Sequence, residues 1–223
     1  MIKSSKFALT LLSVALLCGA AAGSAQATPT FTAGSYPAAV SGSASEIVIG
    51  TDGGVVRCPI NYSGSLSAAS STLNLTTFVE YFNCSAWGFG SMTIVNNGCT
   101  QKFQASKKEA ADQYKGLLTI SCTGSAGIFL KITNAFATCE IEIKPQENLS
   151  TIDLDDVTGA PNRVAVGFEV ANLAYNVTKD TGICPLEGTG ATTNGTMTGK
   201  TFQLQAFNAN KLSEEVGLAV TGE

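Results

Sequence analysis

The chain has 223 residues, a formal net charge of −4 at pH 7, 13% charged residues and no histidine. The acidic balance and the scarcity of Lys and Arg argue against nucleic acid or an anionic membrane surface as the partner, since both need clustered positive charge. The absence of histidine excludes Ser-His and Cys-His nucleophile arrangements and removes the most frequent zinc ligand.

The first 27 residues carry a targeting pattern. Two lysines precede an almost wholly apolar or small run over residues 7–22, and Ala25-Gln26-Ala27 supplies a small-x-small cleavage site. We predict a cleaved signal peptide over residues 1–27, of bacterial type, and a single all-β domain over residues 28–223. Cleavage removes the two lysines, so the net charge changes from −4 to −6. No later stretch has 18 consecutive apolar residues, so no transmembrane segment is expected after cleavage.

Alternation of apolar and polar residues with a period of two dominates the chain after residue 28. Two strands are expected on either side of Asp52-Gly53, because both residues tolerate the positive φ of a tight hairpin turn. Within residues 163–178 the phase of the alternation changes, which predicts a β-bulge near Ala171-Asn172. The other alternating stretches are residues 72–84, 127–133, 139–144, 200–207 and 215–222.

Two stretches depart from this alternation. Residues 106–116 are charged, contain alanine and lack β-branched residues, so they predict a short helix, with a turn or loop between strands as the alternative. Residues 144–162 are the least regular and are interpreted as a long loop inside one domain. Overall we predict an all-β fold of about ten to twelve strands, an antiparallel β-sandwich with a barrel-like variant as the alternative.

Six cysteines follow the expected cleavage site, and an even number in an exported chain indicates three disulfides. A metal cluster is the weaker alternative, because neither a Cys-x-x-Cys motif nor a histidine occurs. Six cysteines allow about fifteen connectivities, and spacing does not choose among them. The connectivity that we select is Cys58–Cys84, Cys99–Cys122 and Cys139–Cys184.

The stretch NCSAWGFGSMTIVNNGC contains the only tryptophan of the chain. Its segment SMTIV, residues 91–95, alternates as a strand does, and Asn97-Gly98 is typical of a turn. Trp87 and Phe89, with Tyr81 shortly before them, have two interpretations. They pack beneath disulfide-tied strands, as large aromatic side chains mostly do, or they form an exposed platform for a sugar ring or a partner chain.

Carboxylates are the remaining candidates for chemistry. Glu140 and Glu142 lie two residues apart on one expected strand and therefore on one face, at a separation that overlaps the one used in glycoside hydrolysis. The alternative is an exposed, solvated polar face. Asp153, Asp155 and Asp156 offer hard oxygen ligands for calcium, although the twelve-residue calcium-loop pattern is not met and a solvated acidic turn is the competing interpretation.

The segments TFTAGSYPAAVSG, CPINYSGSLSAASSTLNLT and NNGCT resemble a group of uncharacterised exported bacterial proteins that are rich in Ser and Thr, contain disulfides and are β-rich. The resemblance covers the first half of the expected mature chain, and its motifs are structural. It implies export and an all-β fold, and it implies no activity.

These patterns support one functional hypothesis and two alternatives. The first is an exported, non-catalytic protein, secreted or held in the periplasm or cell envelope, that acts through its surface on a glycan or a protein and needs no cofactor. The second is a carbohydrate-binding module that uses exposed aromatic side chains. The third is a carboxylate-dependent hydrolase.

Overall fold

The computed structural model describes residues 27–51, 54–78, 84–86, 91–182, 184 and 190–222. The predicted signal peptide, apart from its last residue, therefore lies outside the described residues. So does the Asp52-Gly53 turn, although the strands on either side of it pair as an antiparallel hairpin, as the sequence predicts.

All the regular structure in the described residues is β-strand, in fifteen segments rather than ten to twelve. No helix capable of crossing a membrane occurs in this part of the chain. The strands are β1 (Thr30–Ala33), β2 (Ala38–Thr51), β3 (Gly54–Leu66), β4 (Thr72–Phe78), β5 (Ser85–Ala86), β6 (Ser91–Val95), β7 (Thr100–Ala110), β8 (Gln113–Ser121), β9 (Ile128–Thr133), β10 (Thr138–Ile143), β11 (Gln146–Val157), β12 (Arg163–Asp180), β13 (Gly190–Asn208), β14 (Lys211–Glu215) and β15 (Leu218–Thr221).

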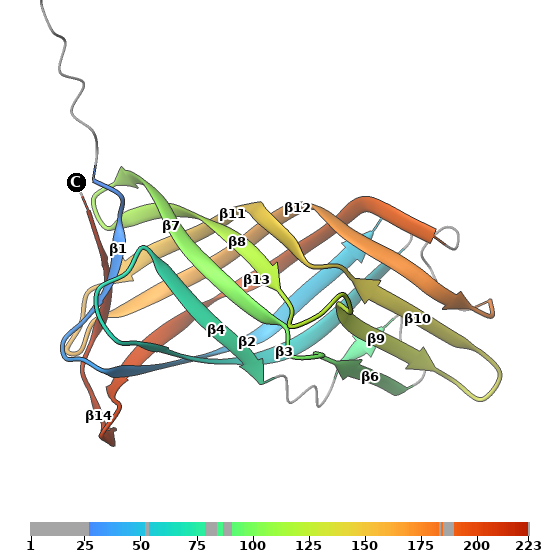
Figure 1. Ribbon diagram of the computed structural model, residues 1–223, viewed down its shortest axis with the longest axis horizontal. Helices are drawn as coiled ribbons and strands as arrows, with labels where there is room; N and C mark the ends of the chain where they lie inside the picture. The colour runs from blue at the N-terminus through green and yellow to red at the C-terminus, as the bar shows by residue number, and fades with distance from the viewer. Residues whose placement is uncertain are drawn as a thin grey trace, which may run out of the picture.

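Thirteen of the strands form one antiparallel sheet that closes on itself. Strands β13, β2, β3, β4, β7, β8, β11 and β12 pair in that order, and β12 pairs with β13 again, so these eight strands make an elongated tube (Figure 1). The all-β antiparallel fold is thus confirmed, and the closed pairing corresponds to its barrel-like variant.

The four longest strands, β2, β3, β12 and β13, run the length of the tube (Figure 1), and β12 changes one of its neighbours part-way along it. The first part of β12 pairs with β11 and the last part with β10, which continues the sheet through β9 and β6. At the change of partner the register shifts between Val170 and Leu173, and Asn172 has a φ of 60°. The predicted bulge is therefore confirmed, and it lets both halves of β12 turn apolar side chains inward.

The interior of the tube is a packed core rather than a channel. Along β3 the residues Val56, Cys58, Ile60 and Tyr62 are buried while Arg57 is exposed. Rings from four different strands meet near the middle: Tyr62, Phe103, Phe168 and Phe202 have centroid separations of 4.8 to 6.4 Å. Strands β1 and β15 form a separate two-stranded sheet at one end of the tube, and bury Phe31, Leu218 and Val220.

Two sequence-based expectations are wrong. Residues 106–116 form no helix but the hairpin of β7 and β8, in which Lys108 pairs with Tyr114. A helix this short is marginally stable, and in these residues pairing along the sheet satisfies the backbone hydrogen-bonding groups instead. Residues 144–162 are not a long loop, because most of them form β11. Two register shifts there space the buried residues Leu149, Ile152 and Leu154 unevenly, which hides the alternation.

Candidate functional site

The three predicted disulfides are present with the predicted connectivity. Cys58–Cys84 ties β3 to the segment before β5, Cys99–Cys122 ties the start of β7 to the end of β8, and Cys139–Cys184 ties β10 to the segment after β12. Their Cα atoms lie 4.3, 3.9 and 5.0 Å apart. All six cysteines are thus used as structural cross-links, and none is free to act as a nucleophile or a metal ligand.

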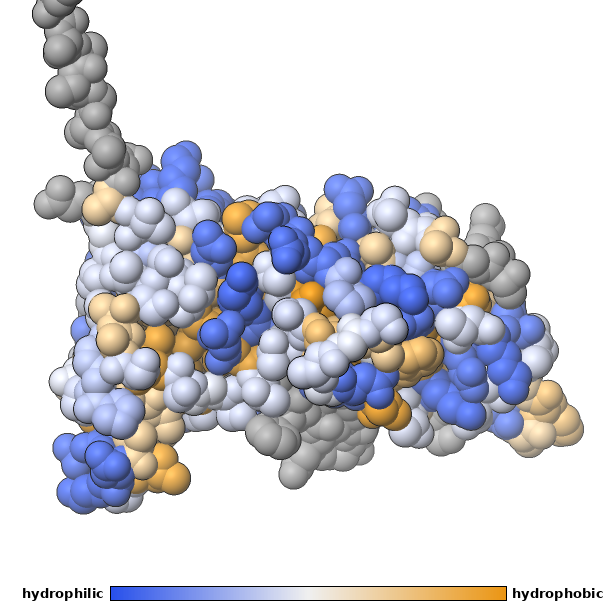
Figure 2. All heavy atoms as spheres, viewed as in Figure 1, coloured by the Kyte–Doolittle hydropathy of each residue, from blue (hydrophilic) through white to orange (hydrophobic). Residues whose placement is uncertain are grey.

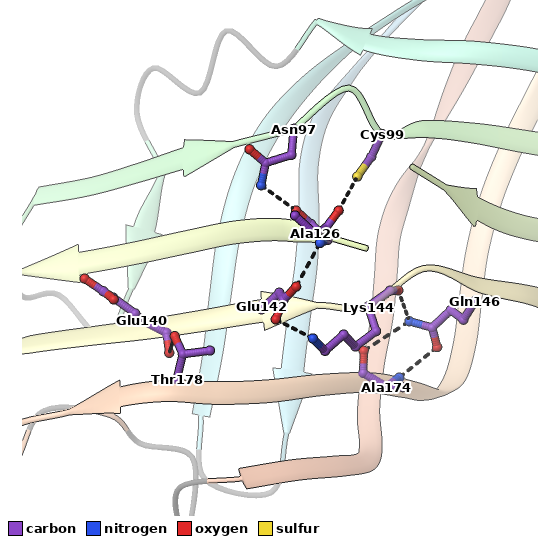
Figure 3. Close-up of polar contacts among 10 residues, drawn as sticks. Asn97, Cys99, Ala126, Glu140, Glu142, Lys144, Gln146, Ala174 and Thr178 are labelled. Atoms are coloured by element: carbon purple, nitrogen blue, oxygen red, sulfur yellow. Dashed lines mark hydrogen bonds and ion pairs between the residues drawn. The ribbon is translucent and has the colours of Figure 1, made fainter. Parts of the chain in front are cut away.

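The two glutamates proposed for hydrolysis are both engaged in ion pairs. Glu140 lies 3.0 Å from Lys131 Nζ, and the Glu142 carboxylate contacts Lys144 Nζ. Glu142 was expected on a solvated face, but it is only 6% exposed, because the segment at Gly127 covers it and donates a backbone N–H to its carboxylate at 2.9 Å (Figure 3).

This environment holds Glu142 in its charged form. Burial alone would raise its pKa, but the Lys144 ammonium and the Gly127 N–H outweigh burial and leave the pKa of Glu142 below its ordinary value. A general acid for glycoside hydrolysis needs the opposite shift. The geometry therefore fits a structural pin between β10 and the loop before β9 better than a catalytic carboxyl.

A second polar contact lies beside β12, between the part that pairs with β10 and the part that pairs with β11. The Gln146 side chain donates to the Ala174 carbonyl oxygen at 3.1 Å and accepts from the Ala174 N–H at 2.8 Å (Figure 3). At the point where β10 ends and β11 begins, the Gln146 amide thus supplies the partner of the Ala174 N–H, while the Ala174 carbonyl also accepts the Lys144 backbone N–H at 3.2 Å. The sequence offered no local signal for this role, because Gln146 and Ala174 are 28 residues apart.

The calcium candidates do not converge. Asp153 and Asp155 share one face of β11, while Asp156 points to the other face and accepts the Val220 N–H at 2.7 Å. Lys115 Nζ contacts the Asp153 carboxylate and already supplies a positive charge there. In the described part of the chain, no group of three or more His, Cys, Asp or Glu side chains is arranged to hold a metal ion. A calcium site here stays a prediction.

Beside Lys115 lies a surface hollow of about 220 Å³ that is lined by Glu109, Asp153 and Asp155 as well. Partial burial and the neighbouring charge of Asp153 raise the pKa of Asp155. The hydrogen bond that the Lys115 ammonium donates to Asp153 raises the pKa of Lys115. This one lysine lies among three carboxylates and offsets part of their charge, so the hollow contains an ion cluster with an excess of negative charge.

Asp156 is expected to make the protein less stable at alkaline than at acidic pH. Burial, reinforced by the charges of Asp112 and Asp155, raises the pKa of Asp156 to about 6 against the opposing hydrogen bond from Val220. The folded chain therefore holds this proton more tightly than the unfolded chain, whose carboxyl has a pKa of 3.8. The resulting stabilisation is complete below the unfolded pKa and is lost as the pH rises through about 6.

Asp156→Asn removes this titration and keeps an oxygen for the Val220 N–H. We compare the free energy of unfolding of Asp156→Asn with that of the wild type at each pH. We expect this difference to favour the variant by roughly 1 kcal/mol more at pH 8 than at pH 4. The value is reduced because the carboxyl is half-exposed. Urea unfolding at both pH values measures the difference. Glu147→Gln, at an exposed position of the same strand, is the control. An equal effect of Asp156→Asn at both pH values would contradict the expectation.

Trp87, Phe89 and Tyr81, the side chains of the predicted aromatic platform, lie outside the described residues. Within the described residues, an exposed aromatic side chain occurs in a turn that carries no aromatic motif in the sequence. Phe136, at the tip of the β9–β10 hairpin, is 97% exposed. Asn134 Oδ1 accepts the backbone N–H groups of Phe136 and Ala137, both at 2.8 Å, and so fixes the turn.

The surface around this tip is mainly hydrophilic or intermediate. Figure 2 shows a small hydrophobic group projecting at the end of the molecule where Figure 1 places the β9–β10 hairpin. The hairpin is braced next to its turn by Cys139–Cys184 and by the hydrogen bonds between Thr138 and Thr181. The phenyl group is therefore held outward on a stiff support.

Comparisons of the chain with protein-family models, with curated proteins and with solved structures found no match.

Proposed function

We propose that this chain is an exported, non-catalytic protein that acts through its surface in the cell envelope or the extracellular space. The observation that carries the proposal is the set of three disulfides, which consumes every cysteine after the expected cleavage site. Disulfides of this kind form and persist in oxidising compartments. The predicted signal peptide would deliver the chain to such a compartment.

Two further observations support the non-catalytic part of the proposal. The carboxylates that the sequence offers for hydrolysis are held in ion pairs with Lys131 and Lys144. The interior of the tube is filled by apolar and aromatic side chains, so its volume is used for packing. A protein built in this way is a rigid scaffold that presents groups on its outside, such as Phe136 on its braced hairpin.

Export is tested by producing the full chain in a bacterium and separating cytosol, envelope and medium. We expect the protein outside the cytosol, with a mass that starts at Thr28 and with no thiol available to an alkylating reagent after denaturation without reductant. Cys58→Ala serves as the positive control, because it leaves Cys84 with one free thiol. Retention of an uncleaved, fully reduced chain in the cytosol would overturn the proposal.

A further inference from the structure

A polar hollow of about 540 Å³ lies on the outer face of the tube, where β12, β13, β2 and β3 are neighbours. The sheet register places its side chains next to one another, since Gln205 pairs with Ser41 and Asn61 pairs with Ser43. The residues that alternate with these, such as Tyr62 and Leu204, point into the core. The side chains that define the polar hollow are Ser41, Ser43, Asn61, Arg163, Gln203 and Gln205.

The one charged group of the polar hollow is already neutralised. Arg163 Nε and Nη2 donate to the two carboxylate oxygens of Glu215 at 2.9 and 3.1 Å, and Nη1 lies 3.4 Å from Gln203 Oε1. A bidentate pair of this kind fixes the guanidinium plane and compensates its charge. The hollow is therefore unsuited to a free anion or cation and is suited to a neutral ligand.

Most of the other polar groups in the hollow are uncommitted. Within the described ranges of the chain, the side chains of Ser41, Ser43, Asn61 and Gln205 make no hydrogen bond to another residue, whereas Gln203 accepts from Arg163. Hydroxyl and amide side chains each offer both donors and acceptors. Several such groups side by side match a ligand that also carries donors and acceptors on every edge, which is the chemistry of a sugar ring.

We propose that the polar hollow binds a short stretch of a neutral, hydroxyl-rich glycan. Its volume falls in the range of small-ligand sites, which is about 300 to 1,000 Å³. The proposal rests on the proposed function, since an exported protein meets glycans in the envelope and outside the cell. It is argued from described residues alone and makes no use of Trp87, Phe89 or Tyr81, which lie outside them.

The test uses the mature protein and a panel of immobilised oligosaccharides, neutral and charged, followed by calorimetric titration of the best ligand. We expect binding to neutral oligosaccharides and a loss of affinity of about tenfold or more in Asn61→Ala/Gln205→Ala, which removes two hydrogen-bonding amides. The matched control is Asn74→Ala/Gln104→Ala, which removes two polar amides from β4 and β7, outside the hollow. Its affinity should stay within about twofold of the wild type.

The melting temperatures of both double variants should equal that of the wild type, which separates a binding defect from a folding defect. Absence of binding to every neutral oligosaccharide, binding to charged ones only, or equal affinity of Asn61→Ala/Gln205→Ala and the wild type would each overturn the polar hollow as a glycan site. Each of these results would leave export and the disulfides intact, so the proposed function would still stand. Failure of export, by contrast, is seen in the fractionation experiment.

Discussion

Removing the disulfide between Cys139 and Cys184 is expected to lower the free energy of unfolding by about 4 kcal/mol. This bridge closes a loop of 45 residues, against 23 for Cys99–Cys122, so it restricts the unfolded chain most. It also fastens β10 to the segment after β12 at the end of the tube where β10 and β9 extend beyond the closed ring. Because a domain is stable by only about 5 to 15 kcal/mol, reduction of all three bridges should unfold the protein.

Urea unfolding of Cys139→Ala/Cys184→Ala, followed by circular dichroism, measures the single-bridge effect. Cys99→Ala/Cys122→Ala is the comparison, with an expected loss of about 3 kcal/mol. Both pairs replace one half-buried and one buried cysteine, so the packing terms are similar. The wild type treated with a reductant at the same pH should lose its cooperative transition. Unchanged unfolding of the reduced protein would show that packing alone stabilises the tube.

The sequence predicted those parts of the fold that depend on local alternation. The hairpin of β2 and β3, the strand β12 with its bulge at Asn172, and the all-β class follow from a period of two and from residues that tolerate positive φ. β11 escaped detection because its register shifts break that period. β7 and β8 escaped because exposed charged residues near their turn resemble the surface of a helix.

The features of the candidate site that the sequence did not predict depend on contacts between residues far apart in the chain. Glu142 looked solvated because its strand alternates, and its burial depends on a segment fifteen residues earlier that folds over it. Arg163 and Glu215 are 52 residues apart, so their ion pair had no local signal. The polar hollow takes residues from four strands between Ser41 and Gln205, and the pairing of β12 with β13 that closes the sheet adds Arg163 to it. Short polar alternations, such as Ser41 with Ser43 and Gln203 with Gln205, were the local signal that the sequence offered.

Replacing Phe103 by alanine is expected to cost about 3 to 5 kcal/mol of unfolding free energy. Phe103 is completely buried, and its ring centroid lies 5.9 Å from Tyr62 and 5.6 Å from Phe168, the latter edge-on. These three residues belong to β7, β3 and β12, so the Phe103 phenyl group fills the space between separate walls of the tube. Its loss removes a large apolar area and two aromatic pairs, and leaves a cavity that closed walls cannot collapse to fill.

The chain provides a matched control for this change. Phe136→Ala removes the same side chain from a position that is 97% exposed, so the free energy of unfolding should change by less than about 0.5 kcal/mol. Phe103→Leu, which keeps most of the volume, should fall between the two alanine variants. Urea unfolding of all three measures the order. If Phe103→Ala and Phe136→Ala were equally stable, the tube would have a loose interior, and its rigidity would depend on the disulfides and the hydrogen-bonded ring of strands alone.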